Sequence, residues 1–259
     1  MFEDILFEKT DGVARVTLNR SRQLNAFRGQ TLDELIEALR QIEADPTVGV
    51  VVLTGAGERA FSSGADIKEN AGASAEQLHH LALTRNLPLG LLMRQLSKPI
   101  IAAIRGYAAV GGVELALFCD LRLAAEDARL RIADEGITPY WGTAQLLARL
   151  VGEGVARELM FLAREIDGRE AARLGLVNRA VPAADLDREV AAWCQRILQR
   201  SPGANELAKL ALNYDTDLLY GGFVQSAALA QAYYRTPQLQ EFLAAFREKR
   251  APDFRRFRA

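Results

Sequence analysis

One acidic side chain stands alone in an apolar helical pattern near the middle of the chain. Glu114 follows the adjacent Gly111 and Gly112, and the residues from Val113 to Cys119 are otherwise apolar. A carboxylate in a buried helix is costly unless it is paired or used, so Glu114 is a candidate catalytic acid or base. The alternative is structural, because a glutamate near a helix N-terminus also complements the helix dipole and paired glycines permit a tight turn.

Two turns offer backbone amides that could serve the same reaction. Ala65 lies in a Ser-Gly-Ala-Asp turn that follows an apolar, β-branched strand pattern over Val48 to Thr54. Gly111 lies in the turn that follows a second apolar run, Ile100 to Ile104. Turns beyond the carboxyl ends of parallel strands converge on one crevice. The two N–H groups could therefore bind one oxygen, as an oxyanion hole does for an enolate or a tetrahedral intermediate.

Composition excludes several other classes of protein. The 259 residues carry a formal net charge of −1, which argues against a broad nucleic-acid surface. The two cysteines, Cys119 and Cys194, lie in apolar helical patterns and are expected to be buried free thiols. The N-terminus has early acids and no basic segment, and no apolar run reaches membrane-spanning length, so we expect a cytoplasmic protein. The only histidines, His79 and His80, show no metal-ligand spacing, so no metal is expected.

Strand and helix patterns divide the chain into two parts. They alternate from a hairpin pattern over residues 5–19 to a last short strand over Val177 to Val181. From Ala184 onward the chain reads almost entirely as helix. The pattern predicts a mixed α/β core over residues 1–183 and a helical part over residues 184–259.

Three motifs together resemble the crotonase superfamily, whose best-known member is enoyl-CoA hydratase. They are Leu-Asn-Ala-Phe at 24–27, Ala-Phe-Ser-Ser-Gly-Ala-Asp-Ile-Lys at 60–68 and Gly-Tyr-Ala-Ala-Val-Gly-Gly-Val-Glu at 106–114. The resemblance covers essentially the whole chain. It implies a spiral of β-β-α repeats with a C-terminal helical oligomerisation region, assembled as a homotrimer or a dimer of trimers.

The resemblance also implies a coenzyme A thioester as substrate, with no tightly bound cofactor. Ala65 and Gly111 would donate their N–H groups to the thioester carbonyl. The structural alternatives are a helix N-cap for Asp66 and a solvated surface charge for Lys68. The positions at which the family holds coenzyme A are Arg22, Leu24, Ala26, Ala65, Asp66, Ile67 and Lys68.

Hydratases of this family use two glutamates to hold one water and move its protons, and Glu114 matches the first. The second should lie between Leu130 and Pro139, where this chain is about two residues shorter than its relatives. Asp134 or Glu135 could fill the role, and we favour Glu135; both could also be solvated loop charges. The resemblance thus implies a hydratase-type lyase that works through an oxyanion-stabilised enolate.

Two departures from the family pattern keep other activities open. Tyr140 and Trp141 replace a glycine-rich turn, and their bulk could favour a cyclic or unusual acyl group. The tail resembles the dihydroxynaphthoyl-CoA synthase and ketocyclohexanecarboxyl-CoA hydrolase branch, in which a tail tyrosine, matched by Tyr234, enters a neighbouring subunit's site. That branch's Ser-x-Asp pair is replaced here by Ile137 and Pro139. The alternatives are an enoyl-CoA isomerase, a ring-cleaving or ring-forming enzyme of that branch, and a catalytically idle CoA-binding protein.

Overall fold

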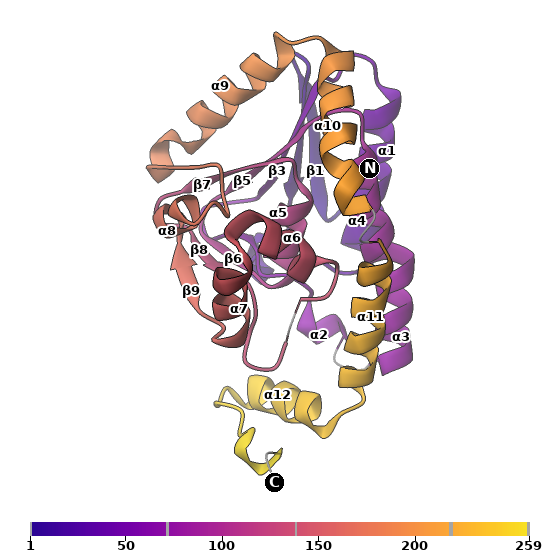
Figure 1. Ribbon diagram of the computed structural model, residues 1–259, viewed down its shortest axis with the longest axis vertical. Coiled ribbons are helices and arrows are strands. Elements are labelled where there is room, and N and C mark those ends of the chain that lie inside the picture. The colour runs from indigo at the N-terminus through magenta and orange to yellow at the C-terminus, as the bar shows by residue number, and fades with distance from the viewer. Residues whose placement is uncertain (1, 71–72, 138, 218–219, 258–259) are drawn as a thin grey trace.

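The computed structural model describes residues 2–70, 73–137, 139–217 and 220–257 (Figure 1). These residues form a mixed α/β fold, which confirms the predicted fold class. Within them no helix combines the length and apolarity needed to cross a bilayer. Cys119 and Cys194 are both buried and free, as predicted.

The described strands form two sheets. The larger sheet is parallel except for its first strand, and its order is β1 (Ile5–Thr10), β2 (Val13–Leu18), β3 (Val50–Gly55), β5 (Ile100–Ile104), β7 (Leu121–Ala125) and β10 (Arg179–Val181). The smaller sheet has the order β4 (Ala60–Ser62), β6 (Tyr107–Ala109), β8 (Arg129–Arg131) and β9 (Glu165–Asp167), of which only β9 is antiparallel to its neighbour.

Helices cover both faces of the larger sheet. Before β10 they are α1 (Gly29–Ala44), α2 (Ile67–Asn70), α3 (Ala75–Leu81), α4 (Leu87–Gln95), α5 (Gly111–Phe118), α6 (Thr143–Val151), α7 (Glu153–Phe161) and α8 (Gly168–Arg173). After it come α9 (Leu186–Leu198), α10 (Pro202–Asp217), α11 (Tyr220–Tyr234) and α12 (Pro237–Glu248). A π-helical turn, Ala82–Asn86, joins α3 to α4, and short 3-10 turns lie at Ser21–Gln23, Ala183–Asp185 and Arg255–Phe257.

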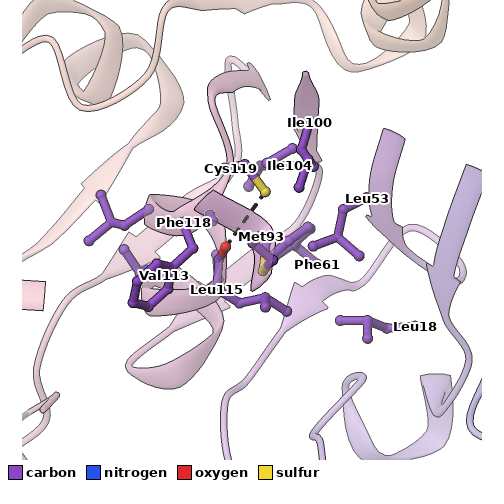
Figure 2. Packing of buried hydrophobic residues seen from close by; sticks show 14 of the residues in the cluster. Leu18, Leu53, Phe61, Met93, Ile100, Ile104, Val113, Leu115, Phe118 and Cys119 are labelled. Atoms are coloured by element: carbon purple, nitrogen blue, oxygen red, sulfur yellow. Dashed lines mark hydrogen bonds between the residues drawn. The ribbon is translucent and has the colours of Figure 1, made fainter. Parts of the chain in front are cut away.

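The central strands are buried on both faces, which their continuous apolar sequences require. Side chains alternate along β3, so Val51 and Leu53 enter the main core while Val50 and Val52 pack against α9 on the other face. Helix α5 is buried along its whole length. In Figure 2 its residues lie against side chains from β3, β5 and α4, and the thiol of Cys119, the residue after the helix, donates to the carbonyl of Leu115 in α5.

Helix α10 is fastened to this core by one buried cation. The Lys209 ammonium donates to the carbonyls of Met93 (2.8 Å) and Lys98 (3.1 Å) and to Asp120 Oδ2 (2.8 Å). Asp120 Oδ2 also accepts from the N–H of Ile100, the first residue of β5. Burial lowers the pKa of Lys209, so the ammonium depends on these acceptors. The bond set links the C-terminal helices to the strand that precedes Gly111.

Replacing this lysine tests the link. Lys209→Met should lower the free energy of unfolding by about 3 kcal/mol, because it leaves a carboxylate and two carbonyls without their donor. The urea midpoint measures the effect. Lys9→Met is the matched control, since the Lys9 side chain is 49% exposed and pairs with Asp45 at the surface. Equal midpoint shifts for the two variants would contradict the role given to Lys209.

Candidate functional site

A cavity of about 600 Å³ gathers most of the predicted site residues. The smaller sheet contributes to it through the turns that follow β4 and β6, and the larger sheet through the loop that follows β2. Helix α12 contributes apolar side chains from the C-terminal part. Glu135 is not among the lining residues. The sequence-predicted residues that line the cavity are Arg22, Leu24, Ala26, Ala65, Asp66, Ile67, Lys68, Gly111, Glu114, Asp134, Tyr140, Trp141 and Tyr234.

The Ala65 amide is left free by the way its turn pairs with Phe27. The N–H of Phe27 donates to Gly64 O (2.9 Å), and the N–H of Asp66 donates to Phe27 O (2.9 Å). In such a parallel bridge the middle residue, Ala65, directs its own N–H and C=O away from the partner. Ala65 and Gly111 both line the cavity, and no described residue accepts a hydrogen bond from either amide.

The two amide-bearing turns touch through glycine. Gly64 has φ +90°, and a Cβ placed on it would come within 2.9 Å of Gly111 N. Only glycine therefore allows the two turns to approach so closely. The convergence of Ala65 and Gly111 that the sequence predicts is present in the structure: two unpaired N–H groups, distant in sequence, lie at one wall of the cavity.

Val110 stores strain at the entry to α5. This β-branched residue has φ +45° and ψ −109°, outside the regions that L-residues ordinarily adopt. Its N–H donates to Arg131 O (2.8 Å), and its carbonyl accepts from the N–H of Glu114 (3.0 Å). Strain of this kind costs about 1–3 kcal/mol and persists where surrounding contacts impose it. The unusual backbone conformation of Val110 turns the chain so that Gly111, the first residue of α5, lies at the cavity.

Glu114 is the buried acid of the site. Its side chain is 2% exposed, and Oε1 accepts from the N–H of Trp141 (2.7 Å) and from the Thr143 hydroxyl (2.6 Å). Burial raises the pKa of Glu114 to about 7, although these hydrogen bonds act in the opposite direction. A carboxyl group with this pKa is present in both protonation states at neutral pH, as a group that both takes and gives a proton must be.

The two candidate second acids differ in their position relative to the cavity. Asp134 lines the cavity, and burial raises its pKa. Both carboxylates pair with Arg131, Asp134 at 3.1 Å and Glu135 at 3.3 Å. The Glu135 side chain is 56% exposed, against 29% for Asp134, and its hydrogen bond with Asp134 lowers the pKa of Glu135. In this chain the geometry therefore favours Asp134 over the expected Glu135.

Residues from the distant C-terminus hold the loop that carries these acids. The Tyr233 hydroxyl donates to Gly136 O (2.9 Å). A Cβ on Gly136 would lie 2.3 Å from the ring of Phe242, so α12 packs directly on the loop. Sequence reasoning could not find these contacts, because nothing local to the loop signals a partner about a hundred residues away.

The loop that carries three of the predicted coenzyme A residues is built around Asn25. This 1% exposed side chain donates to Ala60 O (2.7 Å) and Ala56 O (3.1 Å), and it accepts from the N–H of Arg20 (3.1 Å). Asp66 pairs with Arg20 (3.0 Å) and accepts from the N–H of Lys68 (3.1 Å), so it makes both an ion pair and a cap-like hydrogen bond at the start of α2.

No group of three or more described His, Cys, Asp or Glu side chains is placed to hold a metal ion.

The two aromatic residues that replace a glycine-rich turn take different positions. The Trp141 ring packs against Phe27 (5.4 Å) and Phe118 (6.5 Å) in the core. The Tyr140 ring meets Tyr234 edge to face at 6.0 Å. Tyr234 thus lines the cavity of its own chain, whereas the resemblance to the synthase branch places the tail tyrosine in a neighbour's site. The reason is visible in Figure 1, where α11 runs back along α3.

Sequence reasoning missed several further residues of the cavity. Asn86 comes from the π-helical turn, which no sequence pattern distinguishes from the flanking helices. Leu239, Leu243 and Phe246 come from α12, where the sequence predicted a helix but no part of the site. Tyr107 lay inside a quoted motif, but its motif position gave it no role.

Comparison with known proteins agrees with this geometry. Residues 8–256 match the family model described as enoyl-CoA hydratase/isomerase. The chain is similar to the crystal structure of an enoyl-CoA hydratase from Bacillus anthracis, with 38% identity, 97% of this chain and 99% of that chain covered, and a TM-score of 0.80. It is similar to an enoyl-CoA hydratase from Mycobacterium avium subsp. paratuberculosis, with 31% identity, 98% and 99% covered, and a TM-score of 0.86.

A third solved structure carries a different activity in its description. It is a monofunctional enoyl CoA isomerase from M. smegmatis, which is 36% identical. The match covers 83% of this chain and 94% of that chain, with a TM-score of 0.70. In sequence identity this isomerase lies between the two hydratases, while its coverage of this chain and its TM-score are lower than theirs.

The raised pKa of Glu114 should appear in the pH dependence of stability. Between the ordinary pKa of 4.5 and the folded-state value of about 7, the folded protein holds one proton more than the unfolded chain. The free energy of unfolding therefore falls as the pH rises through this window, by about 3 kcal/mol in total. Glu114→Gln stays neutral and should remove this part of the slope in urea unfolding measured across the window.

Glu58→Gln is the matched control for that measurement. The Glu58 side chain is 80% exposed, so this variant should keep the wild-type slope. Parallel pH profiles for wild type and Glu114→Gln would show that the Glu114 carboxyl ionises as an ordinary surface acid does.

Proposed function

The chain belongs to the enoyl-CoA hydratase/isomerase family and has its crotonase fold, and we propose that it hydrates an enoyl-CoA thioester or catalyses the reverse dehydration. One observation carries this proposal. A buried acid with a pKa of about 7, Glu114, lines the same cavity as the two unpaired amides of Ala65 and Gly111. This combination suits a reaction in which charge develops on a carbonyl oxygen while protons move nearby.

The amides supply the electrostatic part of the proposed reaction. The N–H groups of Ala65 and Gly111 would donate to the thioester oxygen, where negative charge grows as the enolate forms. Donors fixed in advance for a developing oxyanion are worth about 10²–10³ in turnover for each donor. The turns hold these amides through the Phe27 bridge and the strained Val110, so they need no rearrangement when substrate arrives.

Two acidic side chains would transfer the protons of the water. One carboxylate takes a proton as the water oxygen bonds to the β-carbon, the electron pair of the double bond moves into the enolate, and the other carboxyl group protonates the α-carbon. We assign these roles to Glu114 and Asp134. Asp134 replaces the expected Glu135 because Asp134 lines the cavity and Glu135 does not.

The coenzyme A part of the substrate would lie along the polar side of the cavity. Arg22, Leu24 and Ala26 on one loop, and Ala65 to Lys68 on the other, line this side. Arg22 and Lys68 offer positive charge for the phosphates of coenzyme A. No tightly bound cofactor is part of the proposed reaction.

Isomerisation of an enoyl-CoA is the second candidate. It needs one group that takes a proton from one carbon and returns it to another, and Glu114 with its near-neutral pKa meets that need alone. The similarity to the isomerase from M. smegmatis, at 36% identity, also supports this candidate.

Three conservative variants separate the two reactions. Glu114→Gln should lower kcat/KM for both hydration and isomerisation by about 10²–10⁴, the usual worth of a general acid–base group. Asp134→Asn should lower hydration of crotonyl-CoA to a similar extent and leave isomerisation near wild type. Glu135→Gln is the control and should change either rate by less than about threefold, because its carboxylate lies outside the cavity.

The outcomes exclude different parts of the proposal. If Glu114→Gln hydrates crotonyl-CoA nearly as fast as wild type, the acid is wrongly assigned. If Glu135→Gln rather than Asp134→Asn loses hydration, the second acid is Glu135. Turnover of an isomerase substrate without any hydration by the wild type would establish the second candidate instead.

We also propose that the helical part over residues 184–259 joins copies of the chain into a trimer or a dimer of trimers around the core of residues 1–183. Large apolar side chains on α10 support this, since Leu207 is 70%, Leu212 78% and Tyr214 69% exposed. Leu212→Lys should shift the sedimentation coefficient toward that of the monomer, whereas Glu206→Lys on the same helix should not. A monomeric wild type would refute the proposal.

A further inference from the structure

Arg20 is a largely buried cation that the proposed reaction does not use. Its side chain is 16% exposed and contacts the carboxylates of Asp4 (3.7 Å) and Asp66 (3.0 Å). Its Nη1 donates to the carbonyl of Ala26 at 2.6 Å. Ala26 and Asp66 line the cavity, but Arg20 is not among the lining residues. The guanidinium therefore touches two parts of the cavity wall without forming part of the wall itself.

The bond to Ala26 begins a chain of hydrogen bonds that ends at the oxyanion amide. In a trans peptide the C=O and N–H lie in one plane and point in opposite directions. The Ala26 carbonyl that accepts from Arg20 therefore lies opposite the N–H of Phe27. That N–H donates to the carbonyl of Gly64 (2.9 Å), which lies opposite the N–H of Ala65 in the next plane. This last N–H is the one left unpaired at the cavity.

Every donor in this chain points from the cation toward the cavity. The guanidinium polarises the first carbonyl, which makes the N–H in the same plane a better donor, and the second plane repeats the effect. Hydrogen bonds in series strengthen one another by about 10–30% per bond. The first bond is charge-assisted, and such bonds are about twice as strong as neutral ones. The Ala65 N–H is therefore a better donor to a developing oxyanion than an isolated amide is.

Arg20 also holds the other end of this chain in place. Its Nη2 pairs with Asp66, the residue after Ala65, and the N–H of Asp66 donates to the carbonyl of Phe27 (2.9 Å). One guanidinium thus binds the first peptide plane and the residue that follows the second. A guanidinium suits this task because its donors form a planar, rigid fork, whereas a lysine ammonium is a point charge on a flexible stem.

We propose that Arg20 is a positioning residue for the oxyanion hole, which orients and polarises the Ala65 N–H through the two intervening peptide planes. This rests on the proposed function, because the thioester oxygen is the acceptor at the end of the chain. Arg20 acts on the substrate only through these peptides, so its effect appears in how strongly the amide binds the carbonyl oxygen.

The test is the stretching frequency of the thioester carbonyl, because a hydrogen bond to a carbonyl oxygen weakens the C=O bond and lowers that frequency. Butyryl-CoA is saturated and cannot be hydrated, and an isotope label at its thioester carbonyl isolates this group in infrared difference spectra. Binding to the wild type should lower the frequency below its value in water. Arg20→Met should lose most of this shift, and its kcat for hydration of crotonyl-CoA should fall about 10–100-fold.

Arg28→Met is the matched control. Arg28 donates to the same buried Asp4 carboxylate, through Nε (2.8 Å) and Nη2 (3.0 Å), and otherwise to Glu3 at the surface. This variant should lower the urea midpoint about as much as Arg20→Met does, yet keep the wild-type carbonyl frequency. Arg20→Lys keeps a cation and should give a frequency between those of the wild type and Arg20→Met. It decides the question alone if Arg20→Met does not fold.

Two kinds of failure can be told apart. If Arg20→Met or Arg20→Lys keeps the wild-type frequency, or if Arg28→Met loses the shift to the same extent, Arg20 does not act on the amide, while the proposed function stands. If butyryl-CoA bound to the wild type shows the frequency that it has in water, the amides of Ala65 and Gly111 do not bind the thioester oxygen. The proposed function then fails, and the role of Arg20 fails with it.

Discussion

The burial of the Glu114 carboxyl is the constraint on which the rest of the site depends. A carboxyl group in an otherwise apolar helix is tolerated because the Trp141 N–H and the Thr143 hydroxyl both donate to it. Trp141 and Thr143 lie at the start of α6, so their hydrogen bonds to Glu114 also hold the start of α6 against α5. Burial makes the charged form of this carboxyl group unfavourable, and it thereby raises the pKa to near neutrality, as proton transfer requires.

The sheets supply the other half of the site. Strands β4 and β6 are parallel neighbours in the smaller sheet, so the turns that follow them meet, and the absence of a side chain at Gly64 lets these turns touch. Pairing with Phe27 and the strain at Val110 then leave the amides of Ala65 and Gly111 unpaired at the cavity. Rigid elements thus hold the donors, while the loop with Asp134 depends on contacts from α11 and α12.

The features that the sequence predicted are those determined by local pattern. The fold class follows from continuous apolar strands such as β3 and β5. The convergence of Ala65 and Gly111 was predicted from turns after these two strands, but the short strands β4 and β6, which no pattern predicted, lie between them and the turns. The choice between Asp134 and Glu135 could not be predicted, because Tyr233 and Phe242 set that loop from far along the chain. Asn86 was missed because a π-helical turn leaves no distinct periodicity, and the place of Tyr234 depends on how α11 packs along α3.

The central claim is that two amides distant in sequence bind one thioester oxygen beside a single buried acid. A crystal structure of the protein with a saturated acyl-CoA tests it most directly. The account predicts that the thioester oxygen lies about 2.7–3.1 Å from both Ala65 N and Gly111 N, with the acyl chain passing Glu114. A thioester carbonyl that contacts neither amide, or that lies outside the cavity, would contradict it.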